Sequence, residues 1–328
     1  MIARDAAPYD GLSPDRILDA LDSVGVRGDG RLLALNSFEN RVYQVWCDDA
    51  PPVVAKFYRP ARWTDAQIRE EHAFVGELAE REIPAVPPLA LGGSTLNEFE
   101  GFRFAVYERF GGRAPELDRR ETFVRIGRYI ARIHAVGALT RFSSRPALTL
   151  DEFGVASREY LLQHDFLPPD LRVVWQGVVD QALEGAGKAL QRAGRTVSLR
   201  LHGDCHGGNV LWTDAGAHFV DFDDARMGPA IQDLWMLLSG ERAAMEAQLA
   251  ALLEGYADFR ELDRRELMLV EALRTLRLVH YCAWIARRWD DPAFPLAFPW
   301  FNTQRYWQDR ILELREQIAA MDEPPLEA

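Results

Sequence analysis

The pattern of hydrophobic positions changes character about a third of the way along the chain. In the first third, apolar and β-branched residues gather in short runs, such as 53–58 and 102–110, which is typical of strands. From Asp118 onward, apolar residues recur at helical spacing over longer segments. The pattern predicts an α+β fold with two lobes, a β-rich N-terminal lobe over 1–110 and a mainly helical C-terminal lobe over 111–328.

Two helices and a hairpin are predicted within the β-rich lobe. The first helix is expected over 14–24, where a proline stands at its start. The second is expected from 64 to 81, because Thr64 and Gln67 have the spacing of a capping box and apolar residues follow at an approximate helical period. The segment 34–46 predicts two strands joined by a turn.

The second part of the chain is predicted to be a set of long helices. Asp118 and Glu121 resemble a capping box before the first of them, in which Ile126, Ile130 and Ile133 share one face. The proline-rich stretch 289–301 is predicted to be a loop, and its aromatic rings are interpreted as core packing, with the wall of a binding site as the alternative. The later helices are predicted over 172–192, 232–259 and 263–289.

Candidate chemistry is concentrated in the segment LHGDCHGGNVLW, 201–212, and in the FVDFD run that follows it. Four residues separate Asp204 from Asn209, which is the spacing between the catalytic aspartate and the metal-binding asparagine of protein kinases. The apolar runs between Asn209 and Asp221 predict a β-hairpin that brings both residues to the same end of a two-stranded ladder. We therefore predict a phosphoryl-transfer site with Asp204 as catalytic aspartate and Asn209 and Asp221 as Mg²⁺ ligands.

Two further residues are interpreted as supports of this loop. His202 is expected to brace it through hydrogen bonds, because a histidine of the protein-kinase loop has that place. Asp233 is expected either to cap the helix that follows it or to hold the loop from below. His280, within a predicted apolar stripe, is interpreted as a core histidine with no functional role.

A lysine within an apolar strand is the second candidate feature. Lys56 lies in the run 53–58, where a solvated surface charge is a poor explanation. In a kinase, such a lysine reaches the nucleotide phosphates and is held by a glutamate of the next helix. Glu71 is the predicted partner, whereas Glu70 and Glu77 are interpreted as solvated residues of the same helix.

Two other segments are predicted to contact ATP. The turn 36–40 lies where protein kinases carry a glycine-rich phosphate loop, but it contains no glycine. Ser37 and nearby backbone N–H groups are candidate donors to phosphate oxygens, and a plain hairpin turn is the alternative. The strand 102–110 leads into Gly111 and Gly112, which predicts a hinge, with backbone groups near Glu108 facing the adenine.

These motifs carry a family resemblance. The HGDxHxxN loop followed by DF(D/E) resembles the aminoglycoside phosphotransferase and choline kinase superfamily, which has a protein-kinase-like fold. Within it, segments along most of the chain, among them ALNSFENRVYQV and VVAKFYRPARWT, are similar to a bacterial branch of cytoplasmic serine/threonine protein kinases linked to stress survival. The resemblance implies that Asp204 and Asp221 are active-site residues, Asn209 and Asp221 bind Mg²⁺, and Ser37 contacts ATP.

The same resemblance implies a serine or threonine hydroxyl of a protein as acceptor, including autophosphorylation. A small-molecule kinase that acts on an amino alcohol, a sugar or an aminoglycoside is the first alternative. A pseudokinase that binds nucleotide and acts as a scaffold is the second, and the missing glycine-rich loop is its support.

Composition narrows the setting of this activity. The chain has 328 residues, 48% of them hydrophobic, and a formal net charge of −12, which argues against nucleic acid as a partner. It has no apolar run long enough to span a bilayer and no signal-peptide core, so we expect a cytoplasmic protein without a membrane partner, with a monomer as the default.

Three scattered cysteines indicate neither a disulfide framework nor a zinc site. Cys205 lies next to Asp204, which raises the hypothesis that its oxidation switches activity off. An inert residue in a packed loop is the favoured interpretation.

Overall fold

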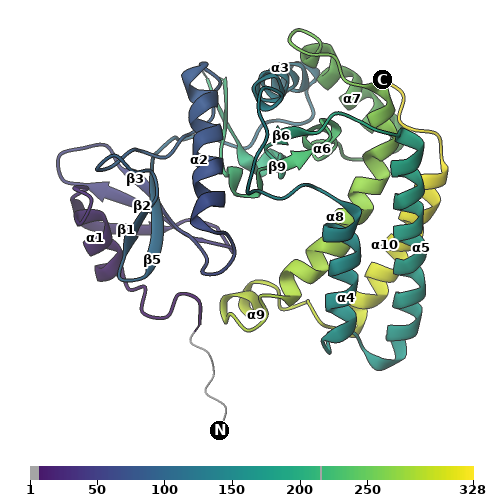
Figure 1. The fold of residues 1–328 in the computed structure, drawn as a ribbon, viewed down its shortest axis with the longest axis horizontal. Helices are drawn as coiled ribbons and strands as arrows, with labels where there is room; N and C mark the ends of the chain where they lie inside the picture. Colours follow the sequence, from purple (N-terminus) through teal and green to yellow (C-terminus); the bar gives the residue numbers. More distant parts are fainter. Residues whose placement is uncertain (1–6, 215) are drawn as a thin grey trace. The chain divides into compact units, whose positions relative to one another are not determined.

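The computed structural model describes residues 7–214 and 216–328, and this part of the chain divides into two compact units. The first unit includes the chain up to Pro115 together with Ser143–Arg145 and Gly208–Asp223. The second unit includes Glu116–Phe142, Pro146–Gly207 and Asp224–Ala328. The first contains an antiparallel sheet and the second is mainly helical (Figure 1), so the α+β fold class is confirmed.

A five-stranded sheet forms the centre of the first unit. Its strands are antiparallel to their neighbours in the order β1-β2-β3-β5-β4. One face is closed by the predicted first helix, α1 (Pro14–Asp22), whose Ile17 and Leu21 pack with Phe57 and Phe104. The strands are β1 (Gly28–Ala34), β2 (Arg41–Cys47), β3 (Val53–Phe57), β4 (Asn97–Phe99) and β5 (Phe102–Glu108).

The second predicted helix of this unit is α2, Asp65–Glu80. Its capping box is present, since the Thr64 side chain accepts a hydrogen bond from the Gln67 backbone and the Gln67 side chain accepts one from the Thr64 backbone. Ile68 of α2 packs with Tyr58 and with residues of β5. Side chains alternate along a strand, so Lys56 points to the opposite side of β3 from its neighbours Ala55 and Phe57.

The predicted hairpin between Asn209 and Asp221 is confirmed and belongs to the first unit. It comprises β7 (Val210–Thr213) and β8 (Gly216–Phe219), which pair antiparallel. Single bridges join it to the rest of the unit at Ala85 and Arg113. Residue 215, between β7 and β8 in the chain, lies outside the described residues.

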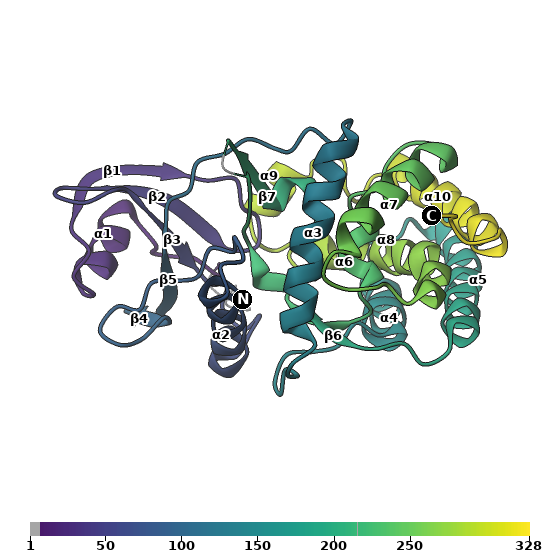
Figure 2. The same cartoon turned by 90° about the horizontal axis from the view of Figure 1, so that it is seen from above.

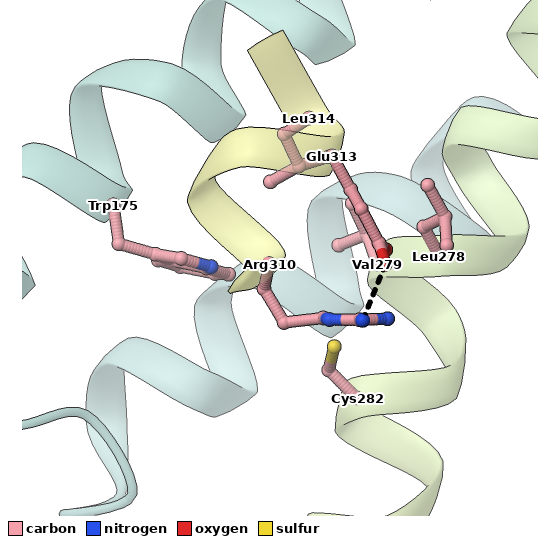
Figure 3. Close-up of a pocket in the computed structure, with 7 residues that line it drawn as sticks. All are labelled: Trp175, Leu278, Val279, Cys282, Arg310, Glu313 and Leu314. Carbon is pink, nitrogen blue, oxygen red and sulfur yellow. Dashed lines mark hydrogen bonds and ion pairs between the residues drawn. The ribbon is translucent and has the colours of Figure 1, made fainter. Parts of the chain in front are cut away.

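The core of the second unit lies where three long helices meet, α5 (Pro169–Ala193), α8 (Val270–Ala286) and α10 (Gln304–Asp322), which lie side by side (Figures 1 and 2). Trp175 and Trp307 are fully buried there, with ring centroids 5.9 Å apart. Figure 3 shows the same junction, where Arg310 and Glu313 form an ion pair beside Cys282. A cavity of about 10 Å³ remains at this point, the size of a single water.

The second unit also contains further α-helices and short strands. They are α3 (Arg120–Gly137), α4 (Ala156–Gln163), β6 (Leu199–Leu201), β9 (Arg226–Gly228), α6 (Ile231–Trp235), α7 (Arg242–Tyr256) and α9 (Ala293–Ala297). Strands β6 and β9 pair antiparallel, and they flank the segment that carries Asp204.

Several boundaries differ from the sequence predictions. The helix predicted over 232–259 is divided into α6 and α7, because Gly240 has a positive φ of 89° between them. The beginning of the helix predicted over 263–289 is a 3₁₀ segment, Arg264–Leu269. The capping box expected at Asp118 is wrong, because α3 begins at Arg120 without a side-chain cap. The loop predicted over 289–301 contains the short helix α9.

The interpretation of the aromatic stretch as core is confirmed. Phe294, Phe298 and Phe301 are all buried and belong to the same apolar cluster as Trp175 and Trp307. Among the described residues, no helix is long and apolar enough to cross a membrane.

Helices α3 and α7 approach each other closely through two glycines. A Cβ atom on Gly127 would lie 2.1 Å from the carbonyl oxygen of Leu252, and one on Gly255 would lie 1.9 Å from that of Val124. Both neighbours are backbone atoms, so a side chain at either position can be accommodated only if the helices move apart.

We therefore expect Gly127→Ala to lower the free energy of unfolding by about 1–3 kcal/mol, the usual effect of overpacking. Gly177→Ala is the matched control, because Gly177 lies inside α5 with no atom within 4 Å of the added Cβ. Alanine favours a helix interior over glycine by about 0.5–1 kcal/mol, so the control should gain stability. Denaturant unfolding of both variants measures this, and equal effects would contradict the packing argument.

Candidate active site

A cavity of about 400 Å³ lies within the first unit and is lined by six of the seven residues predicted from the sequence. They come from the turn after β1, from β3, from α2, from the end of β5 and from both ends of the β7–β8 hairpin. They are Ser37, Lys56, Glu71, Glu108, Asn209 and Asp221. The seventh, Asp204, belongs to the second unit. The fold therefore brings together residues that are up to 184 positions apart in the chain.

Lys56 is buried, and its amine forms two ion pairs. The Nζ atom lies 2.9 Å from Oδ1 of Asp221 and 3.2 Å from Oδ1 of Asp223. Burial alone would lower the pKa of Lys56, but the two carboxylates outweigh it and raise this pKa well above its ordinary value. The lysine is therefore a fixed positive charge at the cavity wall.

Glu71, the predicted partner of Lys56, lies at the same cavity but has a different environment. In the described part of the chain, the ion pairs of Lys56 are with Asp221 and Asp223, and Oε2 of Glu71 accepts no hydrogen bond. Glu71 is 3% exposed, and burial raises its pKa to about 7, although Lys56 and Arg145 act in the opposite direction. Near neutral pH this carboxyl is thus divided between its two protonation states.

A second glutamate of α2, Glu70, fastens a distant segment of the first unit. Glu70 was interpreted as solvated, but its carboxylate accepts hydrogen bonds from the backbone N–H groups of Ser143, Ser144 and Arg145, at 2.6, 2.8 and 2.9 Å. It holds that short segment against α2, which explains why Ser143–Arg145 belongs to the first unit.

The two predicted metal ligands flank the open end of the hairpin. The backbone N–H of Val220 donates to the carbonyl oxygen of Asn209 at 3.0 Å, which closes the ladder just before Asp221. Asp221 has a positive φ of 59°, a conformation that aspartate tolerates better than most residues, and its side chain is 52% exposed. This turn directs an accessible carboxylate into the cavity.

Asp223 is a buried anchor that the sequence prediction did not include in the site. Besides Lys56, its carboxylate pairs with Arg62 and accepts a hydrogen bond from Nδ2 of Asn40 at 3.2 Å. The Asn40 side chain also accepts a hydrogen bond from the backbone of Arg59. The repeated aspartate in FVDFDD was the only signal in the sequence that marks this position.

These contacts determine the shape of the glycine-free turn at 36–40. Glu39 is buried, and its carboxylate pairs with Arg59 and Arg62, while its carbonyl oxygen accepts a hydrogen bond from Arg59. Ion pairs of Glu39 and side-chain hydrogen bonds of Asn40 thus give this turn a fixed form, and Ser37 in this turn lines the cavity. The plain hairpin turn considered as an alternative does not require such anchors.

Most of the other side chains that line the cavity are apolar, and an apolar surface suits a flat aromatic ring. It includes Leu35, Val42, Val54, Val86, Tyr107, Phe110 and Leu211. The Phe110 ring also stacks on His218 of β8, with centroids 4.8 Å apart. The cavity therefore combines charged groups with an apolar surface, as a nucleotide requires.

In the second unit, a buried aspartate holds the loop that carries Asp204. The Asp233 carboxylate accepts hydrogen bonds from the backbone N–H groups of His202, at 2.8 Å, and Gly203, at 2.9 Å. Its Oδ2 also lies 3.1 Å from Nε2 of His134, whose other ring nitrogen contacts Tyr256. Of the two roles expected for Asp233, the structure supports the brace rather than the helix cap, because Ala230 precedes α6.

The backbone of this loop requires a glycine. Gly203 has a φ of 85°, and a Cβ atom there would lie 2.1 Å from the carbonyl oxygen of Asp224. His202 is fully buried, and its Nδ1 accepts a hydrogen bond from the backbone N–H of Asp204 at 3.4 Å, as expected for a scaffold residue. Hydrogen bonds on both sides thus place Asp204.

The Asp204 side chain has a partner on each carboxylate oxygen. Nη1 of Arg277 lies 2.6 Å from Oδ1, and Nε2 of His206 lies 3.5 Å from Oδ2. Burial alone would raise the pKa of Asp204, but the hydrogen bond from His206 and the charge of Arg277 hold this pKa below its ordinary value. Asp204 is therefore ionised at neutral pH and able to accept a proton from a hydroxyl during reaction.

Cys205 is 1% exposed, and burial, with Asp233 and Asp204 nearby, raises the pKa of its thiol well above the ordinary value. Reactive cysteines need a lowered pKa and access to solvent. These observations favour the inert interpretation of Cys205 over the redox switch.

The donors at the cavity fit a hard divalent cation. Asp221 offers an accessible carboxylate and Asn209 an amide oxygen, and Mg²⁺ is usually held by one or two such protein ligands with phosphate oxygens and water. The described residues contain no group of three or more His, Cys, Asp or Glu that could hold a metal, and a site of this kind needs none.

Glu71 makes stability depend on pH in a defined direction. Its pKa is raised in the folded state, so the folded protein binds this proton more tightly, and the associated stability is lost as pH rises from about 4.5 to about 7. Glu71→Gln removes this loss. We expect its unfolding free energy, relative to the native chain, to increase by on the order of 3 kcal/mol between pH 4.5 and pH 8.

Denaturant unfolding at both pH values measures this difference, with Glu80→Gln, exposed on the same helix, as control. A constant difference between Glu71→Gln and the native chain at both pH values would show that Glu71 keeps an ordinary pKa.

Comparisons with known proteins agree with these features. The model of a family described as the phosphotransferase enzyme family matches residues 31–270. The chain is 45% identical over 322 residues to stress response kinase A of Escherichia coli (strain K12), covering 98% of this chain and 97% of that one. It is 43% identical over 325 residues to a protein of Salmonella typhimurium named serine/threonine protein kinase RdoA, covering 98% of each.

Solved structures share the fold at low sequence identity. An amicoumacin kinase in complex with AMP-PNP, Ca²⁺ and Ami has a TM-score of 0.72 at 19% identity and covers 95% of each chain. A microcompartment-associated aminopropanol kinase has a TM-score of 0.70 at 16% identity and covers 94% of this chain and 97% of that one.

The resemblance inferred from the catalytic-loop motif and from segments such as VVAKFYRPARWT is thereby confirmed, including its stress response kinase A branch. The chain belongs to the phosphotransferase enzyme family, and its activity is that of a kinase.

Proposed function

We propose that this protein transfers the γ-phosphoryl group of ATP to a serine or threonine hydroxyl of a protein, including its own chain, in a Mg²⁺-dependent reaction that serves a stress response. The observation that carries the proposal is the single cavity in which Ser37, Lys56, Asn209 and Asp221 meet beside an apolar wall. Its volume of about 400 Å³ is suited to a nucleotide.

ATP would bind with its adenine against the apolar wall, near backbone groups of Glu108, and with its phosphates toward Lys56. The fixed positive charge of Lys56 attracts phosphate oxygens, and Ser37 donates a hydrogen bond from the side of the turn. In this role Lys56 exchanges a carboxylate partner for phosphate, which leaves Asp221 available to a metal. Glu71 then remains beside the lysine as a buried counter-charge.

Asn209 and Asp221 would hold Mg²⁺. When bound, the metal neutralises charge on the phosphates. Both residues are kept in place by the ladder that ends at Val220, so their oxygens are positioned before ligands arrive.

Asp204 would orient the acceptor hydroxyl and accept its proton. The hydroxyl oxygen forms a bond to the γ-phosphorus as the bond from that phosphorus to the bridging oxygen of ADP breaks, and the proton passes to the Asp204 carboxylate. Before the acceptor binds, Arg277 and His206 keep this carboxylate ionised, and His202 and Asp233 hold the loop that carries it.

The acceptor class rests on the named relatives. One is called a serine/threonine protein kinase, and its similarity extends along 98% of both chains. The solved structures named for amicoumacin and aminopropanol share the fold alone, and their acceptors keep a small-molecule kinase as the alternative. We further propose a cytoplasmic monomer with a nucleotide-binding lobe over 1–110 and a catalytic and substrate lobe over 111–328.

Asp204→Ala should lower turnover by about 10² to 10⁴, the range for loss of a general base, with little change in nucleotide affinity. Asp214→Ala, which removes an exposed aspartate of the β7–β8 hairpin, is the control and should keep native turnover. Steady-state turnover and nucleotide binding are compared for both. Native turnover in Asp204→Ala would remove it from the mechanism.

Transfer of labelled γ-phosphate from Mg-ATP identifies the acceptor class. The native chain should label itself or a generic protein acceptor at alkali-labile positions, and Asp204→Ala should not. If no protein is labelled but an amino alcohol, a sugar or an aminoglycoside stimulates ATP consumption, the small-molecule alternative replaces this proposal.

A further inference from the structure

The role given to Arg277 so far is to keep Asp204 ionised, which does not account for the exposed position of its guanidinium. Arg277 projects from α8, and its guanidinium lies 2.6 Å from Oδ1 of Asp204. This oxygen belongs to the carboxylate that is proposed to act as general base. The Arg277 side chain is 40% exposed. The His206 side chain, which approaches Oδ2 of Asp204, is 41% exposed. The contact is therefore at an accessible surface, and neither group is buried there as part of a core.

The charges that face Asp204 are mainly positive. The one carboxylate among those that shift its pKa is Asp224, which already pairs with Arg226 at 2.6 Å. An acceptor that brings an ammonium group to Asp204 would meet the guanidinium of Arg277 and the imidazole of His206. An acceptor that brings an anion would meet complementary charge.

The surface continues along α8 from Arg277. Tyr281 and Trp284 follow at intervals of four and three residues, so these two side chains and Arg277 share one face of the helix. Arg288 lies just beyond the end of the helix at Ala286. The Tyr281 and Trp284 rings stack with centroids 5.7 Å apart, and Arg288 lies over the Trp284 ring. These rings are half-buried, and the stripe has a cation at each end.

Arg277 also occupies an oxygen that the reaction needs. A hydroxyl must donate its hydrogen to the Asp204 carboxylate, and a guanidinium on Oδ1 competes for that lone pair and lowers the basicity of the group. A second anion near the hydroxyl gives the guanidinium another partner, and a bidentate pair with a carboxylate or phosphate is favourable. Binding of such an acceptor would free the base.

We infer that Arg277 is the specificity-determining residue of this kinase: it binds an anionic group adjacent to the acceptor hydroxyl and, by moving to that anion, releases Asp204 for catalysis. The inference rests on the proposed function, and it names the acceptor as a serine or threonine beside an acidic or phosphorylated residue. A small hydroxy acid has the same chemistry, so the test separates these two sources.

The experiment measures kcat/KM of the native chain, Arg277→Ala and Arg277→Lys with matched acceptors. One set is serine peptides that differ only in having glutamate, glutamine or lysine next to the serine. A second set is a hydroxy acid and an amino alcohol of equal length. Arg274→Ala is the matched control, since Arg274 lies one turn away on α8 and pairs with Glu271.

The native chain should prefer the glutamate peptide over the lysine peptide by about 10- to 100-fold, the usual effect of a charge-assisted hydrogen bond. Arg277→Ala should lose this preference, mainly through KM, Arg277→Lys should recover part of it, and Arg274→Ala should retain it. Thermal unfolding of each variant excludes a folding defect as the cause.

The outcomes distinguish this inference from the proposed function. No preference in the native chain, or an unchanged preference in Arg277→Ala, overturns the role of Arg277 while the protein kinase stands. Phosphorylation of the hydroxy acid alone, dependent on Arg277, supports the role of Arg277 and overturns the protein acceptor. Phosphorylation of the amino alcohol in preference to every anionic acceptor overturns both.

Discussion

The ion pairs of the buried Lys56 with Asp221 and Asp223 are the interactions on which the candidate site depends. A lysine amine in the interior of an antiparallel sheet is tolerable only with carboxylates close to it, and here they come from a segment 165 positions later in the chain. The pairing therefore fastens the β7–β8 hairpin to the sheet of the first unit. The same pairing keeps the charge of Lys56 at the wall of the cavity.

A second buried carboxylate has a comparable part in the other unit. Asp233 satisfies two backbone N–H groups of the loop that carries Asp204, and His134 and Tyr256 extend this network into the helical core. In each unit, then, an aspartate that is not proposed to contact the reactants holds a segment that carries a residue proposed to act on them. Asp223 holds the turn that contains Ser37, and Asp233 holds the loop that contains Asp204. Low polarity around such networks strengthens their hydrogen bonds and makes the loss of one partner expensive.

Much of this arrangement could be predicted from the sequence because its signals are local. The capping box at Thr64, the hairpin after Asn209 and the lysine inside β3 each depend on residues a few positions apart. Contacts between distant segments could not be predicted in the same way. Nothing near Lys56 indicates that its partners are Asp221 and Asp223 rather than Glu71, and nothing in α8 marks Arg277 as a neighbour of Asp204. Helical periodicity also continues across Gly240, where the backbone breaks the helix.

The glycine-free turn at 36–40 has a consequence for how this kinase handles its nucleotide. Glycine-rich phosphate loops owe their fit to backbone freedom, whereas this turn is held by Glu39 and Asn40 through Arg59, Arg62 and Asp223. The form of this turn is therefore maintained by ion pairs and hydrogen bonds, and Asp223 links it to Lys56. Such a turn loses little conformational entropy when the phosphates bind, but it also resists deformation. Nucleotide exchange would therefore be governed by the breaking of ion pairs rather than by loop flexibility.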